Sequence, residues 1–125
     1  MRVDEMEAGR ELDVLVAEAM GLDMVVRQTI GPHIIWTPDD KVYEVPRYST
    51  DIAAILPVAE QVVGTGHIKI KLMPPDEWNE LYLAQVALWL GYIDPVRTAA
   101  EAATGGQAIA LALARAVVTA KKVLP

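Results

Sequence analysis

The segment Tyr48-Ser49-Thr50-Asp51-Ile52-Ala53-Ala54 has the sequence of a helix N-terminus. Two hydroxyl residues, Ser49 and Thr50, can cap a first turn that also contains an acid. The first N–H groups of a helix lack intrahelical partners and carry partial positive charge, so such a start can hold an anion. Arg47 precedes the segment and adds a cation. We therefore predict a helix from Ser49 or Thr50 to about Val63, with a candidate anion site at its start.

One proline lies inside this predicted helix. Pro57 removes a backbone hydrogen bond and crowds the carbonyl of Ala53, which costs about 3 kcal/mol in a regular helix. We therefore expect a kink or a break at Pro57. The sequence Gly64-Thr65-Gly66 is expected to end the helix.

The clearest strand pattern is the alternation His67-Ile68-Lys69-Ile70-Lys71-Leu72. Its aliphatic side chains are predicted to face the core, and the histidine and lysines to face the other way. A covered sheet face would not hold these charges, so we expect a strand at a sheet edge or with one exposed face. A hairpin is predicted earlier in the chain, with strands at residues 34–36 and 42–45 joined by a turn at 38–41.

Two further helices follow from the spacing of apolar residues. Residues 5–20 form an amphipathic pattern with Gly21 as its stop. Residues 107–122 are apolar almost all round, which is typical of a helix buried on more than one side. The alanine-rich residues 99–103 could form one helical turn. Residues 77–92 fit a helix or a strand equally well.

Three segments, at residues 7–18, 48–54 and 108–116, resemble in order and spacing the phage ABA-sandwich domain family. The family consists of small phage and prophage proteins in which an aromatic strand lies between the second and last helices. The resemblance therefore implies a strand at residues 77–83. Residues 84–106, longer than the family pattern, would extend that strand, add another or form a loop. The implied fold is α+β, one domain over residues 1–125, with an antiparallel sheet of about four strands and about three helices in an α-β-α sandwich.

The composition excludes several classes of protein. With 53% hydrophobic and 22% charged residues, the 125-residue chain is too apolar to be disordered. No apolar run reaches the roughly 18 residues of a membrane helix, and the N-terminus lacks the apolar core of a secretory signal. The net charge of -6 disfavours binding to duplex nucleic acid. Together with the phage resemblance, these features predict a protein of the host cell cytoplasm.

Catalytic and metal-binding patterns are weak in this sequence. The histidines His33 and His67 have no second ligand at metal-binding spacing, and cysteine is absent. Ser49 is the only serine, and helix capping accounts for it. The acidic pairs at 39–40 and 76–77 fall in predicted turns. We therefore predict no catalytic residues, no metal and no cofactor.

The candidate ligand site combines two predicted helix starts. Arg47, Tyr48, Ser49 and Thr50 belong to the first, and Arg97, Thr104 and Gly105 to the second. Tyr48 or Trp78 could stack on a base. The alternative is plain capping at both starts. The strand face with His67, Lys69 and Lys71 is a second candidate anion surface, and edge protection is the alternative for it.

The functional hypothesis is a non-enzymatic phage accessory protein that forms a homo-oligomer. In its specific form it is an anti-defence sponge that sequesters a nucleotide-derived immune signal of the host. The interface of the homo-oligomer is predicted at residues 84–92. One alternative is a module that inhibits or adapts a host or phage protein through the apolar residues 81–92. Another is a small nucleotide hydrolase.

Overall fold

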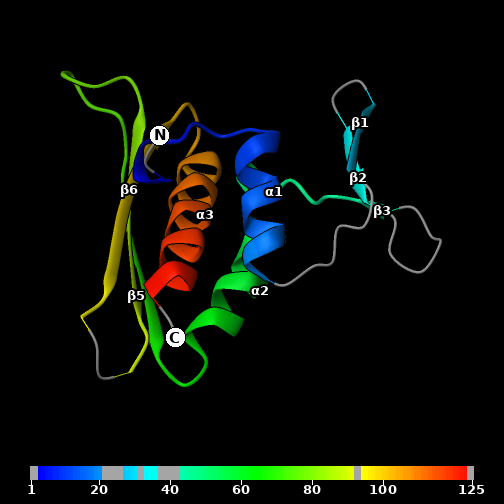
Figure 1. The fold of residues 1–125 in the computed structure, drawn as a ribbon. Helices are drawn as coiled ribbons and strands as arrows, with labels where there is room; N and C mark the ends of the chain where they lie inside the picture. Colours follow the sequence, from blue (N-terminus) through cyan, green and yellow to red (C-terminus); the bar gives the residue numbers. More distant parts are fainter. Residues whose placement is uncertain (1–2, 21–26, 31–32, 37–42, 92–93, 124–125) are drawn as a thin grey trace.

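The structure, a computed structural model, describes residues 3–20, 27–30, 33–36, 43–91 and 94–123 (Figure 1). Its larger sheet is antiparallel and has the strand order β4-β5-β6, with β5 in the centre. These strands are β4 (His67–Met73), β5 (Tyr82–Trp89) and β6 (Val96–Ala102). The helices are α1 (Arg10–Ala19), α2 (Ile52–Val63) and α3 (Gly105–Val123), preceded by a short 3-10 helix, η1 (Val3–Glu5).

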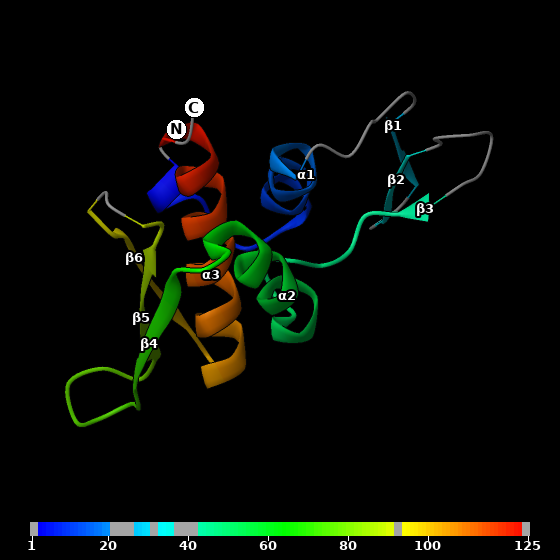
Figure 2. The ribbon, with the colours of Figure 1, turned by 90° about the horizontal axis from the view of Figure 1, so that it is seen from below.

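The described helices all lie on one side of this sheet (Figures 1 and 2). Helix α3 packs on β5 and β6, and α1 and α2 pack on α3. The order of layers is therefore sheet, α3, then α1 with α2. The α+β class is confirmed, but the sheet has three strands rather than about four. The predicted α-β-α sandwich, with the sheet between helical layers, is not seen in the described part of the chain.

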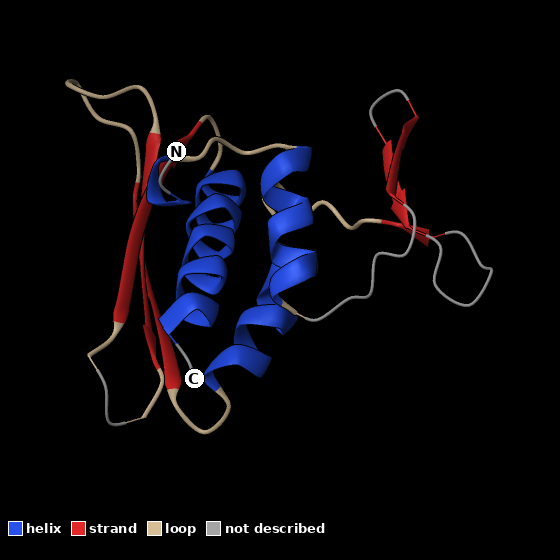
Figure 3. Cartoon of the chain, in the orientation of Figure 1, coloured by secondary structure: helices blue, strands red, loops and turns tan. Residues whose placement is uncertain are grey.

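A second, small sheet has the order β1-β2-β3. It consists of β1 (Arg27–Ile30), β2 (His33–Trp36) and β3 (Tyr43–Glu44), drawn at the right of Figure 3. The predicted hairpin is confirmed, since Ile35 pairs with Glu44 and Trp36 with Tyr43. These strands account for the missing fourth strand, because they pair with one another instead of joining the larger sheet. The predicted turn at 38–41 and the predicted stop at Gly21 lie outside the described residues.

Small side chains on more than one face let α3 pack closely between the sheet and the other helices. Ala108, Ala110, Ala112 and Ala114 are fully buried. Thr98 of β6 donates a hydrogen bond from Oγ1 to the carbonyl of Ala112 at 2.7 Å, which satisfies a buried hydroxyl. The prediction that this helix is buried on more than one side is confirmed.

The helix boundaries differ from the predicted ones at their N-termini. Helix α1 begins at Arg10 instead of residue 5, after η1 and a short connection. Helix α2 begins at Ile52, and Asp51 is its cap: the carboxylate accepts a hydrogen bond from the N–H of Ala53 at 3.0 Å. The predicted caps Ser49 and Thr50 were therefore wrong. Helix α2 also continues through Pro57 without a break.

The second half of the chain contains more strand than predicted. Strand β5 begins at Tyr82 instead of residue 77, because residues 76–81 form a turn held by side-chain hydrogen bonds. Residues 99–103, predicted as a helical turn, belong mostly to β6. Alanine favours helix only weakly, and pairing with β5 overrides that preference here.

Strand β4 is the edge of its sheet, as its lysines indicated. Its predicted core face is only partly covered. Ile68 packs against the core, whereas Ile70 and Leu72 are 38% and 39% exposed. Helix α3 lies over β5 and β6, so the edge strand extends beyond its cover.

Candidate functional site

The segment just before α2 and the start of α1 share a buried hydrogen-bonded cluster, which we call the buried node. Ser49 is fully buried, and both its N–H (2.7 Å) and its Oγ (2.6 Å) lie within hydrogen-bond distance of Asp13 Oδ1. The N–H of Gly9, just before α1, donates to Ser49 Oγ at 2.9 Å. Ser49 therefore connects the start of α1 to the segment before α2, and its hydroxyl points into the protein.

Arg10 completes this node. Its Nη1 forms a 2.8 Å ion pair with Asp13 Oδ2, and its Nη2 donates to the carbonyl of Val45. Tyr48 is buried beside them; burial raises the pKa of its phenol, and the Asp13 carboxylate adds to that increase. Arg10 and Asp13 were not predicted as site residues, although their i,i+3 spacing is a signal for an ion pair on one helix face.

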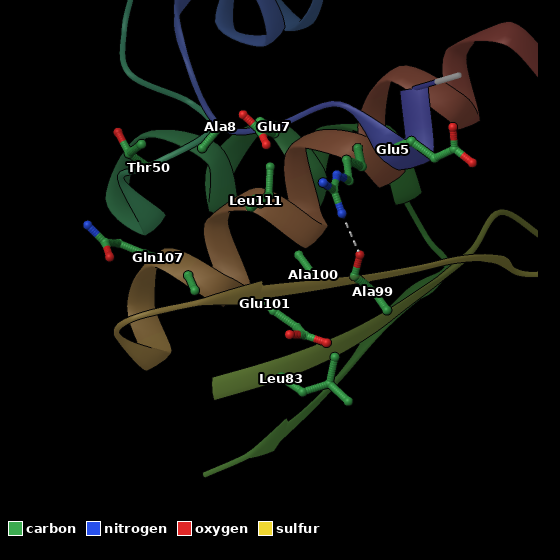
Figure 4. A pocket seen from close by; sticks show the side chains of 12 residues that line it. Glu5, Glu7, Ala8, Thr50, Leu83, Ala99, Ala100, Glu101, Gln107 and Leu111 are labelled. Carbon is green, nitrogen blue, oxygen red and sulfur yellow. Dashed lines mark hydrogen bonds between the residues drawn. The ribbon is translucent and has the colours of Figure 1, made fainter. Parts of the chain in front are cut away.

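The two predicted helix starts line one pocket of about 650 Å³ (Figure 4). Thr50 comes from the α2 side and Gln107 from the first turn of α3. The same pocket is also lined by three carboxylates, those of Glu5, Glu7 and Glu101. An anion in this pocket would be repelled by all three carboxylates.

Among the described residues, Arg115 is the cation that lines this pocket, and its guanidinium already bonds to backbone carbonyls. Arg115 donates from Nε to the carbonyl of Met6 at 2.7 Å, and from Nη1 to the carbonyl of Ala99 at 2.8 Å. Thr104 caps α3 by accepting from the N–H of Gln107 at 3.2 Å. Plain capping, the alternative weighed for this helix start, thus matches the geometry at Thr104.

On the other face of the sheet, a second hollow is lined, within the described part of the chain, by cations and by no acidic side chain. No described helix covers this face, and Lys69, Lys71 and Arg97 are all exposed there. The strand register places Lys69 and Arg97 on either side of Ala87, and Lys71 opposite Gln85 in the next row. Together with Ala99, these residues line this hollow of about 640 Å³. We call this surface the open face.

An aromatic stack forms one end of the open face. The rings of His67 and Trp89 are stacked, with centroids 4.5 Å apart and planes inclined by 13°. The guanidinium carbon of Arg97 lies 5.7 Å from the centroid of the Trp89 ring, within the range of a cation–π interaction. The stack restrains Arg97 beside the hollow.

The predicted ligand residues are not assembled into one site. Arg97 lies on the open face, and Trp78, 91% exposed, lies on the loop between β4 and β5. Gly105 opens α3 against Leu72; a Cβ there would approach Leu72 Cδ2 to 2.9 Å. Arg47 and Thr50 are exposed, while Tyr48 and Ser49 are buried. Of the predicted set, only Arg97 lines the hollow of the open face.

Comparison with known proteins adds no relative. No family model matches the chain, and neither a curated protein nor a solved structure does. Within the described ranges, no cluster of three or more metal-ligating side chains is found. None of the helices described here combines the length and apolar character that crossing a bilayer requires.

Proposed function

We propose that this chain binds a small anionic ligand with a flat ring, a nucleotide or nucleotide-derived molecule, on the open face. One observation supports it most strongly. In a chain with a net charge of -6, three exposed cations surround a hollow on an uncovered sheet face. Like charges so close together repel one another, and a bound anion would relieve that repulsion.

The register suits a phosphate group. Neighbouring strands lie about 4.8 Å apart, so two strand spacings separate the backbones of Lys69 and Arg97. Ala87 lies between them and has too small a side chain to fill the gap. A phosphate over Ala87 could therefore contact both cations, with Lys71 and the Gln85 amide next to it.

The aromatic end of the open face suits a ring. The stacked rings of His67 and Trp89, with the guanidinium of Arg97 over the Trp89 ring, offer a surface on which a base could stack. Stacking tolerates different bases, so it supports the ligand class rather than one member of it.

In this proposal the protein sequesters its ligand and catalyses no reaction. The resemblance to phage ABA-sandwich proteins favours a specific version, in which the ligand is a nucleotide-derived immune signal of the host and the protein acts in the host cytoplasm. Chromatography of cyclic dinucleotides incubated with the protein tests the hydrolase alternative, which requires new products.

Calorimetric titration tests the binding directly. The ligands are cyclic di- and trinucleotides and ADP-ribose, added to the wild type and to the Lys69→Glu/Lys71→Glu variant. We expect binding by the wild type and at least about tenfold weaker binding by the variant, because tenfold corresponds to only about 1.4 kcal/mol. The control is Lys121→Glu/Lys122→Glu, an equal charge change at exposed positions on α3, which should bind like the wild type. No binding of any of these ligands at micromolar concentration would refute the proposal.

A further inference from the structure

The loop between β4 and β5 presents a large aromatic side chain to solvent. Residues 74–81 extend beyond the end of the sheet as the green loop at the upper left of Figure 1. Trp78 lies in this loop and is 91% exposed. A tryptophan is costly to leave in water, and buried tryptophans often carry much of the energy of protein interfaces.

The loop is held in one conformation by its own hydrogen bonds. The carboxylate of Asp76 accepts from the N–H groups of Trp78 (2.8 Å) and Asn79 (2.9 Å). The side chain of Asn79 accepts from the N–H of Leu81 at 3.0 Å, and the N–H of Asp76 donates to the carbonyl of Asn79 at 2.9 Å. Trp78 is therefore positioned before any partner binds, which lowers the ordering cost of an interface.

The surroundings of Trp78 are acidic. Asp76, Glu77 and Glu80 are exposed, and residues 74–81 contain no basic side chain. We call this loop the acidic tip. Its partner must offer basic groups around a surface that can accept an indole ring.

The open face of the same protein has both properties. Lys69, Lys71 and Arg97 surround a hollow of about 640 Å³ with small apolar side chains at Ala87 and Ala99. We propose that the acidic tip of one copy docks on the open face of a second copy, with Trp78 over the alanines. The negative charge of the tip complements the positive charge around the hollow, which favours a second copy of this chain as the partner.

The two surfaces cannot meet within one chain. The tip directly continues β4 and β5, and Met73 is paired with Leu83 at its base. The strands thus direct the tip away from their own face, and reaching it would require breaking the last pairs of the hairpin. Since tip and face are different surfaces, the contact is head to tail and builds a ring or an open chain of copies. A ligand on the open face would compete with the tip.

Sedimentation velocity without ligand tests the contact over a range of protein concentrations. We expect the mass of the wild type to rise with concentration. Trp78→Ala should weaken the association at least tenfold without unfolding the protein, because the side chain is almost fully exposed. Glu77→Lys/Glu80→Lys makes the tip basic, and Lys69→Glu/Lys71→Glu makes the face acidic. Each of these variants alone should remain monomeric.

The decisive experiment is sedimentation of an equimolar mixture of the two charge-reversed variants. Each then offers the surface that the other lacks, so the equimolar mixture should associate. Net charge does not explain such association, since the variants carry -6 + 4 = -2 and -6 - 4 = -10. Glu11→Lys/Glu60→Lys reverses exposed acids on α1 and α2 and should assemble like the wild type.

Three results would overturn this contact: a monomeric wild type, a mixture that stays monomeric, or assembly that survives Trp78→Ala. None of them bears on ligand binding. The Trp78→Ala variant keeps the complete open face, so its calorimetric titration tests the proposed function separately.

Discussion

The start of α2 and the open face both gather charged and hydroxyl or aromatic residues, but they do so in opposite ways. At the start of α2, the cation Arg10 and the hydroxyl of Ser49 both contact the carboxylate of Asp13, and all three residues are largely buried. On the open face, the cations Lys69, Lys71 and Arg97 lie exposed beside one another. In the first region the polar groups have their partners inside the protein and stabilise the fold, whereas in the second the charges stay available to a binding partner.

This difference shows what distinguishes a structural polar cluster from a binding surface. Residue type does not, because both regions contain an arginine and an aromatic residue: Arg10 and Tyr48 near the start of α2, and Arg97 and Trp89 on the open face. Hydrogen-bond satisfaction and solvent exposure distinguish the two kinds of site. A buried polar group needs its hydrogen-bond partners inside the protein, whereas a ligand site retains exposed groups that can change partner. Variants near the start of α2 should therefore lose stability, and variants on the open face should lose ligand binding.

The largest effect is expected for Asp13→Ala. The substitution removes the carboxylate that pairs with the partly buried Arg10 and accepts from the buried N–H of Ser49, which should cost about 3–5 kcal/mol of unfolding free energy. Urea denaturation measures it. Asp51→Ala, which removes an exposed cap, is the matched control at about 1 kcal/mol. Equal losses in the two variants would contradict the buried node.

Ser49→Ala should have a smaller effect in the same region. It removes the hydroxyl that serves Asp13 and the N–H of Gly9, which should cost about 1–3 kcal/mol. Thr50→Ala, at the exposed neighbouring position, should change stability by less than about 0.5 kcal/mol. If thermal or urea unfolding ranked the two variants in the reverse order, Ser49 would not be the structural residue.

Arg97→Ala should affect binding and leave the fold unchanged. We expect about tenfold weaker affinity for the ligand, equivalent to about 1.4 kcal/mol, with stability within about 0.5 kcal/mol of the wild type. Arg47→Ala removes an exposed arginine at the start of α2 and should bind the ligand normally. Calorimetry on the pair decides between the two regions, and the opposite outcome would restore the helix start as the site.

The smallest effect is a change with pH at Tyr48. Its pKa is raised above the ordinary value of 10.0 in the folded state, so the unfolded chain loses this proton first as pH rises. Stability from Tyr48 is therefore complete below about pH 10 and decreases between the ordinary and the raised pKa. In Tyr48→Phe this decrease should disappear. Urea midpoints between pH 8 and 11 measure it, and parallel curves for the two proteins would count against it.

Much of the fold could be predicted from sequence because its signals are local. The alternation at His67 to Leu72 and the apolar spacing of the last helix gave elements of the right type. The cap at Asp51 was misassigned because Ser49 is an equally good cap in sequence and is instead used by α1, a partner 40 residues away. The helical turn expected at 99–103 failed because pairing with β5 is a long-range effect.

The candidate site could be predicted only in part. The lysines of β4 were predicted either as an anion surface or as edge protection, and Arg97 as a candidate ligand residue, but the sequence did not indicate that they share a face. That juxtaposition depends on β5 lying between β4 and β6. Trp89 and His67 likewise come together only through their register across two strands.

Backbone amide NMR of the 15N-labelled Trp78→Ala variant, during titration with cyclic dinucleotides and ADP-ribose, shows whether the ligand binds on the open face or at the helix starts. It compares both regions in one experiment, with the docking of the acidic tip weakened. We predict that the amides of Lys69, Ala87 and Arg97 shift progressively, while those of Glu7, Thr50 and Gln107 stay fixed. Shifts confined to the second group would place the ligand in the pocket at the helix starts and contradict the account.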